Sequence, residues 1–217
     1  MSEASKPDIR AGVIAVQGNV AEHAAAIERA GERRGLSVAV ERIRQAGTVP
    51  HCDVLCLPGG ESTAISQLLD REGIDAEIIE HVASGKPVLA TCAGLIVAAA
   101  DPQDDRVQSL DVLDVSVNRN AFGRQVDSFE APLSIDGITD PETPFPAVFI
   151  RAPVIDEVGQ DVEVLARWED DPVAVRDGPV VATSFHPELT NDDRLHRLVL
   201  SAAIDTLSTA QPAEMDV

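Results

Sequence analysis

The first half of the chain alternates short apolar runs with segments of helical periodicity. The runs are rich in Val, Ile and Leu and lack polar alternation, which is typical of strands buried on both faces of a parallel sheet. The predicted strands cover residues 11–16, 38–43, 53–57 and 87–91, and the predicted helices cover residues 20–34, 62–69 and 74–84. Because strands and helices alternate from the start, the pattern predicts βαβ units and a sheet covered by helices.

The pattern changes after Asp101 to closely spaced strands with few helical segments. Strands are predicted at residues 112–117, 128–135, 147–150, 162–168, 173–175 and 180–185. We expect them to form a mixed or antiparallel extension of the sheet, because short connections join antiparallel strands. A last helix is predicted over residues 192–207, with a buried stripe of Leu195, Leu198, Val199, Ala202 and Ala203.

These elements predict an α/β fold, a three-layer sandwich with a mostly parallel central sheet and an antiparallel extension. The length of 217 residues suits one domain, since domains typically contain roughly 100–200 residues. We expect a single domain over residues 1–217, with a core from about 10 to 207 and frayed tails at 1–9 and 208–217. Aromatic residues make up only 3%, so Val, Ile, Leu and Ala must fill the core.

The charge balance is strongly acidic, with 37 Asp and Glu against 17 Lys and Arg and a net charge of −20. A nucleic-acid partner is not expected, because binding phosphates requires a basic surface. The acidic residues are spread along the chain, which favours a solvated surface suited to high salt over a specific acidic docking face. No segment reaches the ~18 apolar residues of a membrane helix, and no signal peptide is present, so we expect a cytoplasmic protein.

Cys92 lies where the apolar strand PVLAT ends and the helical segment AGLIVAAA begins. The positive end of a helix dipole favours the thiolate, which is the nucleophilic form. Small neighbours such as Ala93 and Gly94 permit a tight nucleophile-elbow turn whose backbone amides can bind an oxyanion. The alternative is a buried inert cysteine, and this is the interpretation we favour for Cys52 and Cys56, because no helix begins after either.

His186 and Glu188 follow the predicted strand at residues 180–185. A histidine at the carboxyl end of a strand lies on the edge where α/β active sites assemble, and a carboxylate two residues later can orient its ring. The alternative is a surface histidine. The four other histidines, which have no comparable setting, are His23, His51, His81 and His196.

The segment LPGGEST at residues 57–63 leads from a strand through two glycines into a helix. Paired glycines allow positive φ and close approach of the backbone to a ligand, so their amides can donate to an oxyanion. The alternative, compatible with the first, is a helix cap with Ser62 as the N-cap. A Walker loop would require a lysine that is absent here, which argues against nucleotide binding.

Together these segments resemble class I, triad-type glutamine amidotransferases, in which a Gly-Gly loop, a Cys elbow and a His-x-Glu motif follow in this order. Within that class the chain is similar to the glutaminase subunits of pyridoxal 5′-phosphate synthase. The matching segments are VQG at 16–18, PGGEST at 58–63, TCAGLI at 91–96, NRNAFGRQVDSFEA at 118–131, FIRAP at 149–153 and SFHPELT at 184–190. The resemblance spans residues 11 to about 200 and implies a flavodoxin-like class I glutamine amidotransferase fold.

The resemblance implies a triad of Cys92 as nucleophile, His186 as base and Glu188 as the residue that orients the base. It also implies glutamine contacts from Gly60, Glu61, Ser62, Arg119, Ile150 and Arg151, oxyanion donors at Gly60 and Ala93, and a partner-responsive segment at Gln17 and Gly18. The implied reaction hydrolyses L-glutamine to L-glutamate and ammonia through a cysteine thioester. The ammonia would pass to the barrel-shaped synthase subunit for vitamin B6 biosynthesis, and no metal or cofactor is implied.

Three other functions compete with this one. Another ammonia-donating glutaminase, such as the one serving histidine biosynthesis, should lack the NRNAFGRQ and FIRAP segments, which are present here. A cysteine hydrolase or peptidase on a similar sheet would turn over without a synthase and ignore free glutamine. A non-enzymatic module would have no need of an intact Cys92, His186 and Glu188.

Overall fold

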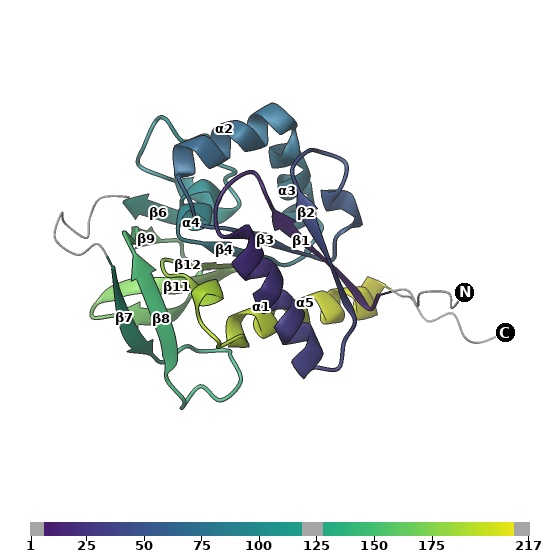
Figure 1. The fold of residues 1–217 in the computed structure, drawn as a ribbon. Coiled ribbons are helices and arrows are strands. Elements are labelled where there is room, and N and C mark those ends of the chain that lie inside the picture. Colours follow the sequence, from purple (N-terminus) through teal and green to yellow (C-terminus); the bar gives the residue numbers. More distant parts are fainter. Residues whose placement is uncertain (1–6, 119–127, 211–217) are drawn as a thin grey trace, which may run out of the picture.

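The computed structural model describes residues 7–118 and 128–210, and its described residues build one large sheet of seven strands. Across the sheet the order is β10-β11-β12-β4-β3-β1-β2 (Figure 1). The strands are β1 (Ile9–Ile14), β2 (Val38–Ile43), β3 (Val54–Leu57), β4 (Val88–Thr91), β10 (Glu163–Trp168), β11 (Asp171–Asp177) and β12 (Val180–Thr183). The five strands from β12 to β2 are parallel, whereas β11 and β10 continue the sheet in antiparallel fashion. The predicted mostly parallel sheet with an antiparallel extension is therefore confirmed.

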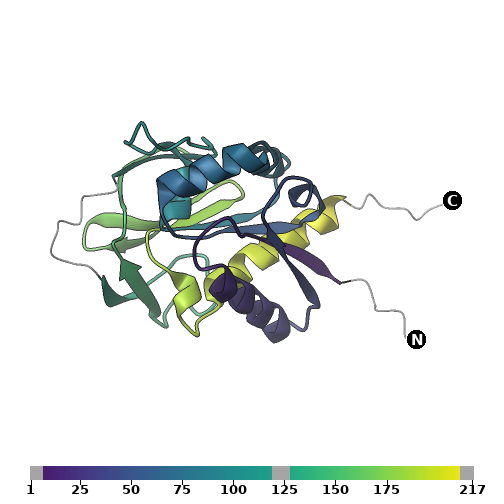
Figure 2. The same cartoon turned by 45° about the horizontal axis from the view of Figure 1, so that its top comes forward.

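Helices cover both faces of this sheet, as Figure 2 shows. One face carries α1 (Val20–Arg33) and α5 (Arg194–Ala210), and the other carries α2 (Ser62–Glu72), α3 (Ile74–Ala83) and α4 (Ala93–Ala98). Successive side chains of β3 alternate between the two cores, since Val54 and Cys56 join the core under α1 and α5 while Leu55 and Leu57 join the other. A strand packed on both faces must be apolar at every position, which explains its sequence.

The prediction that the strands after Asp101 all extend the main sheet is wrong in part. Of the later strands, β12 joins the parallel part of the main sheet and β10 and β11 extend it. The strands β5 (Ala99–Asp101), β6 (Leu113–Asn118) and β9 (Val154–Val158) form a separate three-stranded sheet. The strands β7 (Ser128–Leu133) and β8 (Phe145–Ile150) form a separate antiparallel hairpin. The two small sheets pack against opposite cores, so each covers one face of the main sheet at its β10–β12 end. The strands β5 and β9 were not predicted.

The order of the central strands explains where a site can form. The strands β12, β4 and β3 are neighbours and parallel, so their carboxyl ends meet at one edge. The segments that follow them are the His186 segment with the short 3-10 helix η2 (Pro187–Leu189), the Cys92 turn and the Gly59–Gly60 loop. Loops that follow the carboxyl ends of parallel strands are the usual place for ligands in such sheets.

Candidate active site

Cys92 forms a strained turn between β4 and α4. Its φ of 51° and ψ of −105° lie in a region that residues with a side chain rarely adopt. The turn is held by a hydrogen bond from its backbone amide to the carbonyl of Thr183, at 2.8 Å. Close packing holds it from behind, because a Cβ on Gly94 would lie 2.1 Å from the carbonyl oxygen of Leu57. The predicted nucleophile elbow therefore has the geometry that exposes a cysteine at the start of a helix.

His186 lies beside this turn and bonds to both neighbours that the resemblance implied. Its Nδ1 is 2.7 Å from Glu188 Oε1, and its ring also hydrogen-bonds with Cys92. Burial lowers the pKa of His186, but the hydrogen bonds and charge attraction of Cys92 and Glu188 outweigh burial and raise this pKa to about 10. The imidazole is therefore protonated at neutral pH, which is the form that stabilises a neighbouring thiolate.

Glu188 is fully enclosed and has partners that the sequence analysis missed. Asn19 Nδ2 donates to Oε1 at 3.0 Å, and His23 Nε2 lies 3.4 Å from Oε2. Burial raises the pKa of this carboxyl, but His23, His186 and Asn19 outweigh burial and hold the pKa at about 2. His23 does not follow a strand as His186 does, but it lies against Glu188, which the sequence analysis did not foresee. Its position four residues before Ile27 on the apolar stripe of α1 was the signal that it faces inward.

The glycine loop is tied to the loop after β1. A Cβ on Gly18 would lie 1.8 Å from the carbonyl oxygen of Gly59, and φ at Gly18 is 101°, so only glycine fits. Gln17 Oε1 accepts the backbone amide of Glu61 at 3.1 Å. These contacts connect the predicted partner-responsive segment directly to the loop that carries Gly60.

The N-cap of α2 is Glu61 and not Ser62, which corrects the sequence analysis. The Glu61 carboxylate accepts the backbone amides of Thr63 and Ala64 at 3.3 and 2.7 Å. A carboxylate also interacts favourably with the positive end of the helix, which gives it an advantage over the hydroxyl. The Ser62 hydroxyl is left buried, with no hydrogen-bond partner among the described residues.

A cavity of about 520 Å³ brings most of the predicted site together. It is lined by Gln17, Gly18, Asn19, Gly59, Gly60, Glu61, Ser62, Cys92, Ala93, Ile96, Ile150, Arg151 and His186. Cys92 Sγ lies 3.9 Å from the carbonyl oxygen of Ile150. Glu188 lies behind His186 and outside the cavity, and Arg119 lies outside the described residues. The volume suits a small polar substrate such as an amino acid.

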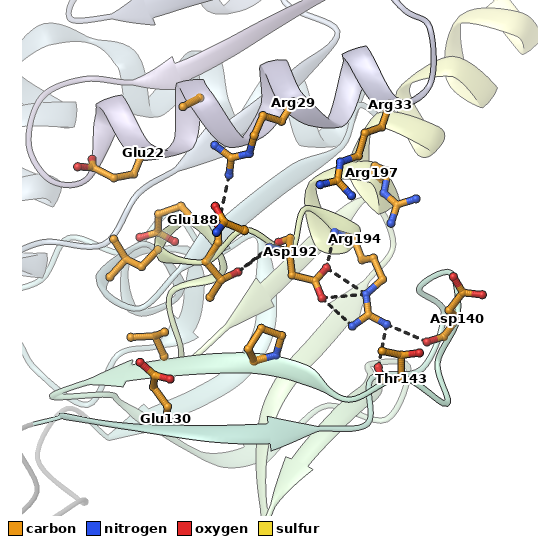
Figure 3. A pocket seen from close by; sticks show the side chains of 16 residues that line it. Glu22, Arg29, Arg33, Glu130, Asp140, Thr143, Glu188, Asp192, Arg194 and Arg197 are labelled. Carbon is orange, nitrogen blue, oxygen red and sulfur yellow. Dashed lines mark hydrogen bonds and ion pairs between the residues drawn. The ribbon is translucent and has the colours of Figure 1, made fainter.

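A larger cavity of about 880 Å³ lies beside α1, α5 and the β7–β8 hairpin (Figure 3). Its charged lining consists of Arg29, Arg33, Arg194, Arg197, Glu22, Glu130, Asp140, Glu188 and Asp192. Arg194 pairs with Asp192 at 2.7 Å, while Arg33 and Arg197 each approach Asp193 at 3.1 Å. These arginines hold the segment before α5, and their charge is balanced by the acids around them. We therefore place the chemistry in the smaller cavity.

The remaining cysteines are core residues, as predicted. Burial raises the pKa of Cys52 to about 11 and that of Cys56 to about 12. The ligand atoms of His23, Cys56 and His196 lie within 4.8 Å of one another. The two histidines already hydrogen-bond at 3.3 Å, and a metal would need the thiolate that burial of Cys56 disfavours. We assign no metal to this cluster.

Comparisons with known proteins agree with this geometry. The family model of the SNO glutamine amidotransferase family matches residues 13–204. A protein of Halobacterium salinarum named "Pyridoxal 5'-phosphate synthase subunit PdxT" is 69% identical over 206 residues, covering 95% of this chain and 98% of that relative. A relative of the same name from Haloquadratum walsbyi is 69% identical over 194 residues, and the match covers 89% of this chain and 93% of the length of that relative.

A solved structure described as "Crystal structure of glutamine amidotransferase" is 43% identical to this chain, with a TM-score of 0.77. The alignment covers 89% of this chain and 98% of that one. In the part of the chain that the structure describes, no helix has both the length and the apolar character needed to cross a membrane.

Proposed function

The chain belongs to the SNO glutamine amidotransferase family, and on that premise we propose that it hydrolyses L-glutamine to L-glutamate and ammonia. The ammonia serves a pyridoxal 5′-phosphate synthase in vitamin B6 biosynthesis, as the name of the 69% identical relative indicates for that protein. The observation that carries the activity is the alignment of Cys92 and His186 at the wall of one cavity, with Glu188 behind His186 and bonded to its ring. The fold of the solved glutamine amidotransferase supports the same conclusion.

The reaction begins when the Cys92 thiolate attacks the side-chain carbonyl carbon of glutamine. The protonated His186 then gives its proton to the leaving nitrogen, so that ammonia departs and a thioester remains. Neutral His186 next takes a proton from water, which attacks the thioester and releases glutamate. Glu188 keeps the ring oriented through its 2.7 Å bond to Nδ1 and stabilises the imidazolium in each cycle.

Both attacks form a tetrahedral oxyanion that needs hydrogen-bond donors. We assign this role to the backbone amides of Gly60 and Ala93, which line the same cavity as Cys92. Ala93 opens α4, and the first amides of a helix have no acceptor within it. Its amide is therefore available to the substrate.

The glutamine contacts follow from what else lines the cavity. The buried Ser62 hydroxyl has no hydrogen-bond partner among the described residues and is free to bind a polar group of the substrate. Arg151 supplies a guanidinium suited to the α-carboxylate, and the backbone of Ile150 lies next to Cys92. Glu61 lies at the same wall and is suited to the α-ammonium group. Arg119 remains a prediction from the family resemblance.

The partner subunit acts through Gln17 and Gly18 in this proposal. Because Gly18 packs on Gly59 and Gln17 binds the amide of Glu61, any movement of the first loop is transmitted to the oxyanion loop. Docking of the barrel-shaped synthase subunit on this side would thereby activate hydrolysis. We also propose that the chain acts as one glutaminase domain, in line with the family match over residues 13–204.

The test is release of glutamate from glutamine, with and without a pyridoxal 5′-phosphate synthase subunit, at molar and at low salt. Cys92→Ala serves as the blank and Cys52→Ala as the matched control, because Cys52 is buried away from the cavity. We expect hydrolysis mainly with the partner, its loss in Cys92→Ala and its retention in Cys52→Ala. Docking should depend on salt, because the exposed like charges of a chain with a net charge of −20 repel one another unless they are screened.

The competing functions predict other results in the same assay. A cysteine hydrolase or peptidase would ignore glutamine and need no synthase. A non-enzymatic module would release no glutamate under any condition, and a normal rate in Cys92→Ala would refute the assignment of the nucleophile.

A further inference from the structure

A buried pair of histidines lies directly behind the triad. His23 comes from α1 and His196 from α5, and both are completely enclosed. His23 Nε2 lies 3.4 Å from Glu188 Oε2 and 3.1 Å from Thr91 Oγ1, while its Nδ1 lies 3.3 Å from His196 Nε2. The chain Cys92–His186–Glu188 thus continues through His23 to His196 in the core.

The contacts determine where the proton of each ring lies. Burial lowers the pKa of both His23 and His196, so both rings are neutral and carry one proton each. Glu188 Oε2 is a buried carboxylate oxygen that makes no hydrogen bond with the described residues, and His23 Nε2 approaches it to 3.4 Å. A buried anion requires a donor. His23 therefore carries its proton on Nε2, facing Glu188 and Thr91, and its Nδ1 accepts the Nε2 proton of His196.

Thr91 links the same ring to the oxyanion loop. Its Oγ1 accepts the backbone amide of Gly59 at 3.2 Å, and it lies 3.1 Å from His23 Nε2. A Cβ on Gly59 would lie 2.5 Å from His186 Cε1, so this loop packs directly on the catalytic ring. One nitrogen of His23 thus adjoins both the orienting carboxylate and the anchor of the loop.

We propose that His23 is a positioning residue of the glutaminase reaction, which holds Glu188 Oε2 so that Oε1 faces His186. The inference rests on the proposed function and goes beyond the triad that the family resemblance implied. His23 touches neither the substrate nor the reacting atoms. Its effect is exerted through Glu188, because Asn19 and His186 both contact Oε1 and only His23 approaches Oε2 among the described residues.

Few charged groups compete with this contact. The titratable or charged groups that bear on His23 and His196 are Glu188, His186, Glu22, Cys56 and Arg29. Among these, Glu188 is the group within bonding reach of His23 Nε2. A neutral donor suits this position, because it binds the carboxylate without neutralising the charge that His186 needs.

The test compares two amide side chains at position 23. In His23→Gln the amide nitrogen reaches the place of Nε2 and restores a donor to Glu188, whereas in His23→Asn the amide is too short. The matched control is His81→Asn, since His81 is also a buried histidine of lowered pKa but bonds the carbonyl of Pro87. Glutamate release with the synthase subunit gives kcat and KM, and iodoacetamide labelling of Cys92 gives its reactivity against pH.

We expect His23→Asn to lower kcat by roughly 10- to 100-fold, the range for a lost polar contact to a charged group, with KM unchanged. Cys92 alkylation at neutral pH should slow, because a misplaced Glu188 stabilises the imidazolium of His186 less. His23→Gln should recover most of the kcat and most of the Cys92 reactivity. His81→Asn should keep the wild-type values of kcat and Cys92 reactivity. Equal losses in His23→Asn and His81→Asn, or a His23→Asn protein with unchanged kcat, would overturn the proposal.

The wild-type protein supplies a measurement that does not depend on any variant folding. The ¹⁵N chemical shifts of His23 should report a neutral ring protonated at Nε2, and a ring protonated at Nδ1 would also overturn the proposal. The alkylation comparison needs neither glutamine nor the partner. If the wild type released no glutamate, the proposed function would fail, while labelling would still decide the role of His23.

Discussion

Adding one methyl group at Gly59 should disable catalysis while leaving the fold intact. Gly59 lies outside the left-handed φ region, so alanine is compatible with its backbone. The added Cβ would lie 2.5 Å from His186 Cε1 and 3.2 Å from Cys92 Cβ, whereas ordinary contacts begin at 3.4 Å. The imidazole must therefore retreat by about 1 Å, and its 2.7 Å bond to Glu188 cannot survive unchanged.

A displacement of about 1 Å in a catalytic group costs roughly 10²-fold in rate, which corresponds to about 3 kcal/mol of activation free energy. We expect Gly59→Ala to lose this much kcat in glutamate release with the synthase subunit. Its thermal unfolding midpoint should change little, because the clash is confined to the cavity wall.

Gly85→Ala is the matched control for the substitution at Gly59. A Cβ at Gly85 meets nothing within 4 Å, but φ is 78°, so alanine is strained there. This variant should lose about 1 kcal/mol of stability and keep its kcat. Normal turnover by Gly59→Ala would mean that the loop yields instead of the ring, and it would refute the reasoning.

Three further outcomes are expected. Iodoacetamide should label Cys92 in the folded protein and leave Cys56 unlabelled until unfolding, since burial raises the pKa of Cys56 to about 12; mass spectrometry locates the label. Burial lowers the pKa of His81 to about 4 from 6.5, so its contribution to stability is present above pH 6.5 and is lost as pH falls towards 4. Denaturant unfolding at constant salt should show a loss of about 3 kcal/mol from this group, and His81→Gln should flatten the pH dependence. Gly18→Ala should abolish turnover even with the partner present, because its Cβ would meet the carbonyl oxygen of Gly59 at 1.8 Å. We expect this variant to release no glutamate and still to unfold in a cooperative transition.

The sequence alone predicted those parts of the site that follow directly from strand ends. Cys92 and His186 each follow an apolar run, and parallel neighbouring strands bring their carboxyl ends together. The predicted strand at residues 38–43 matches β2 residue for residue. Local apolar pattern and chain order were sufficient for these assignments.

Contacts between distant side chains could not be predicted in this way. The bond between Asn19 and Glu188 joins residues 169 positions apart, and His23 and His196 are 173 apart. Helical periodicity places His23 on a buried face, but it does not say which polar group it meets there. The apolar pattern of a strand likewise does not indicate which other strands it pairs with. For this reason the sequence analysis assigned the β7–β8 hairpin to the main sheet. The choice of Glu61 as N-cap depends on a longer side chain folding back, which residue preferences at Ser62 do not reveal.

The precision of this site comes from backbone segments in direct contact with one another. Gly18 packs on the carbonyl of Gly59, Gly94 packs on the carbonyl of Leu57, and Gly59 packs on the ring of His186. Each contact is too close for a side chain, so each segment limits the movement of the next. The strained φ of Cys92 persists because these neighbours leave its backbone no room to relax. Gly18 belongs to the loop after β1, at the start of this series of contacts. A partner that moves this loop would therefore reach the oxyanion donors and the catalytic ring without touching either.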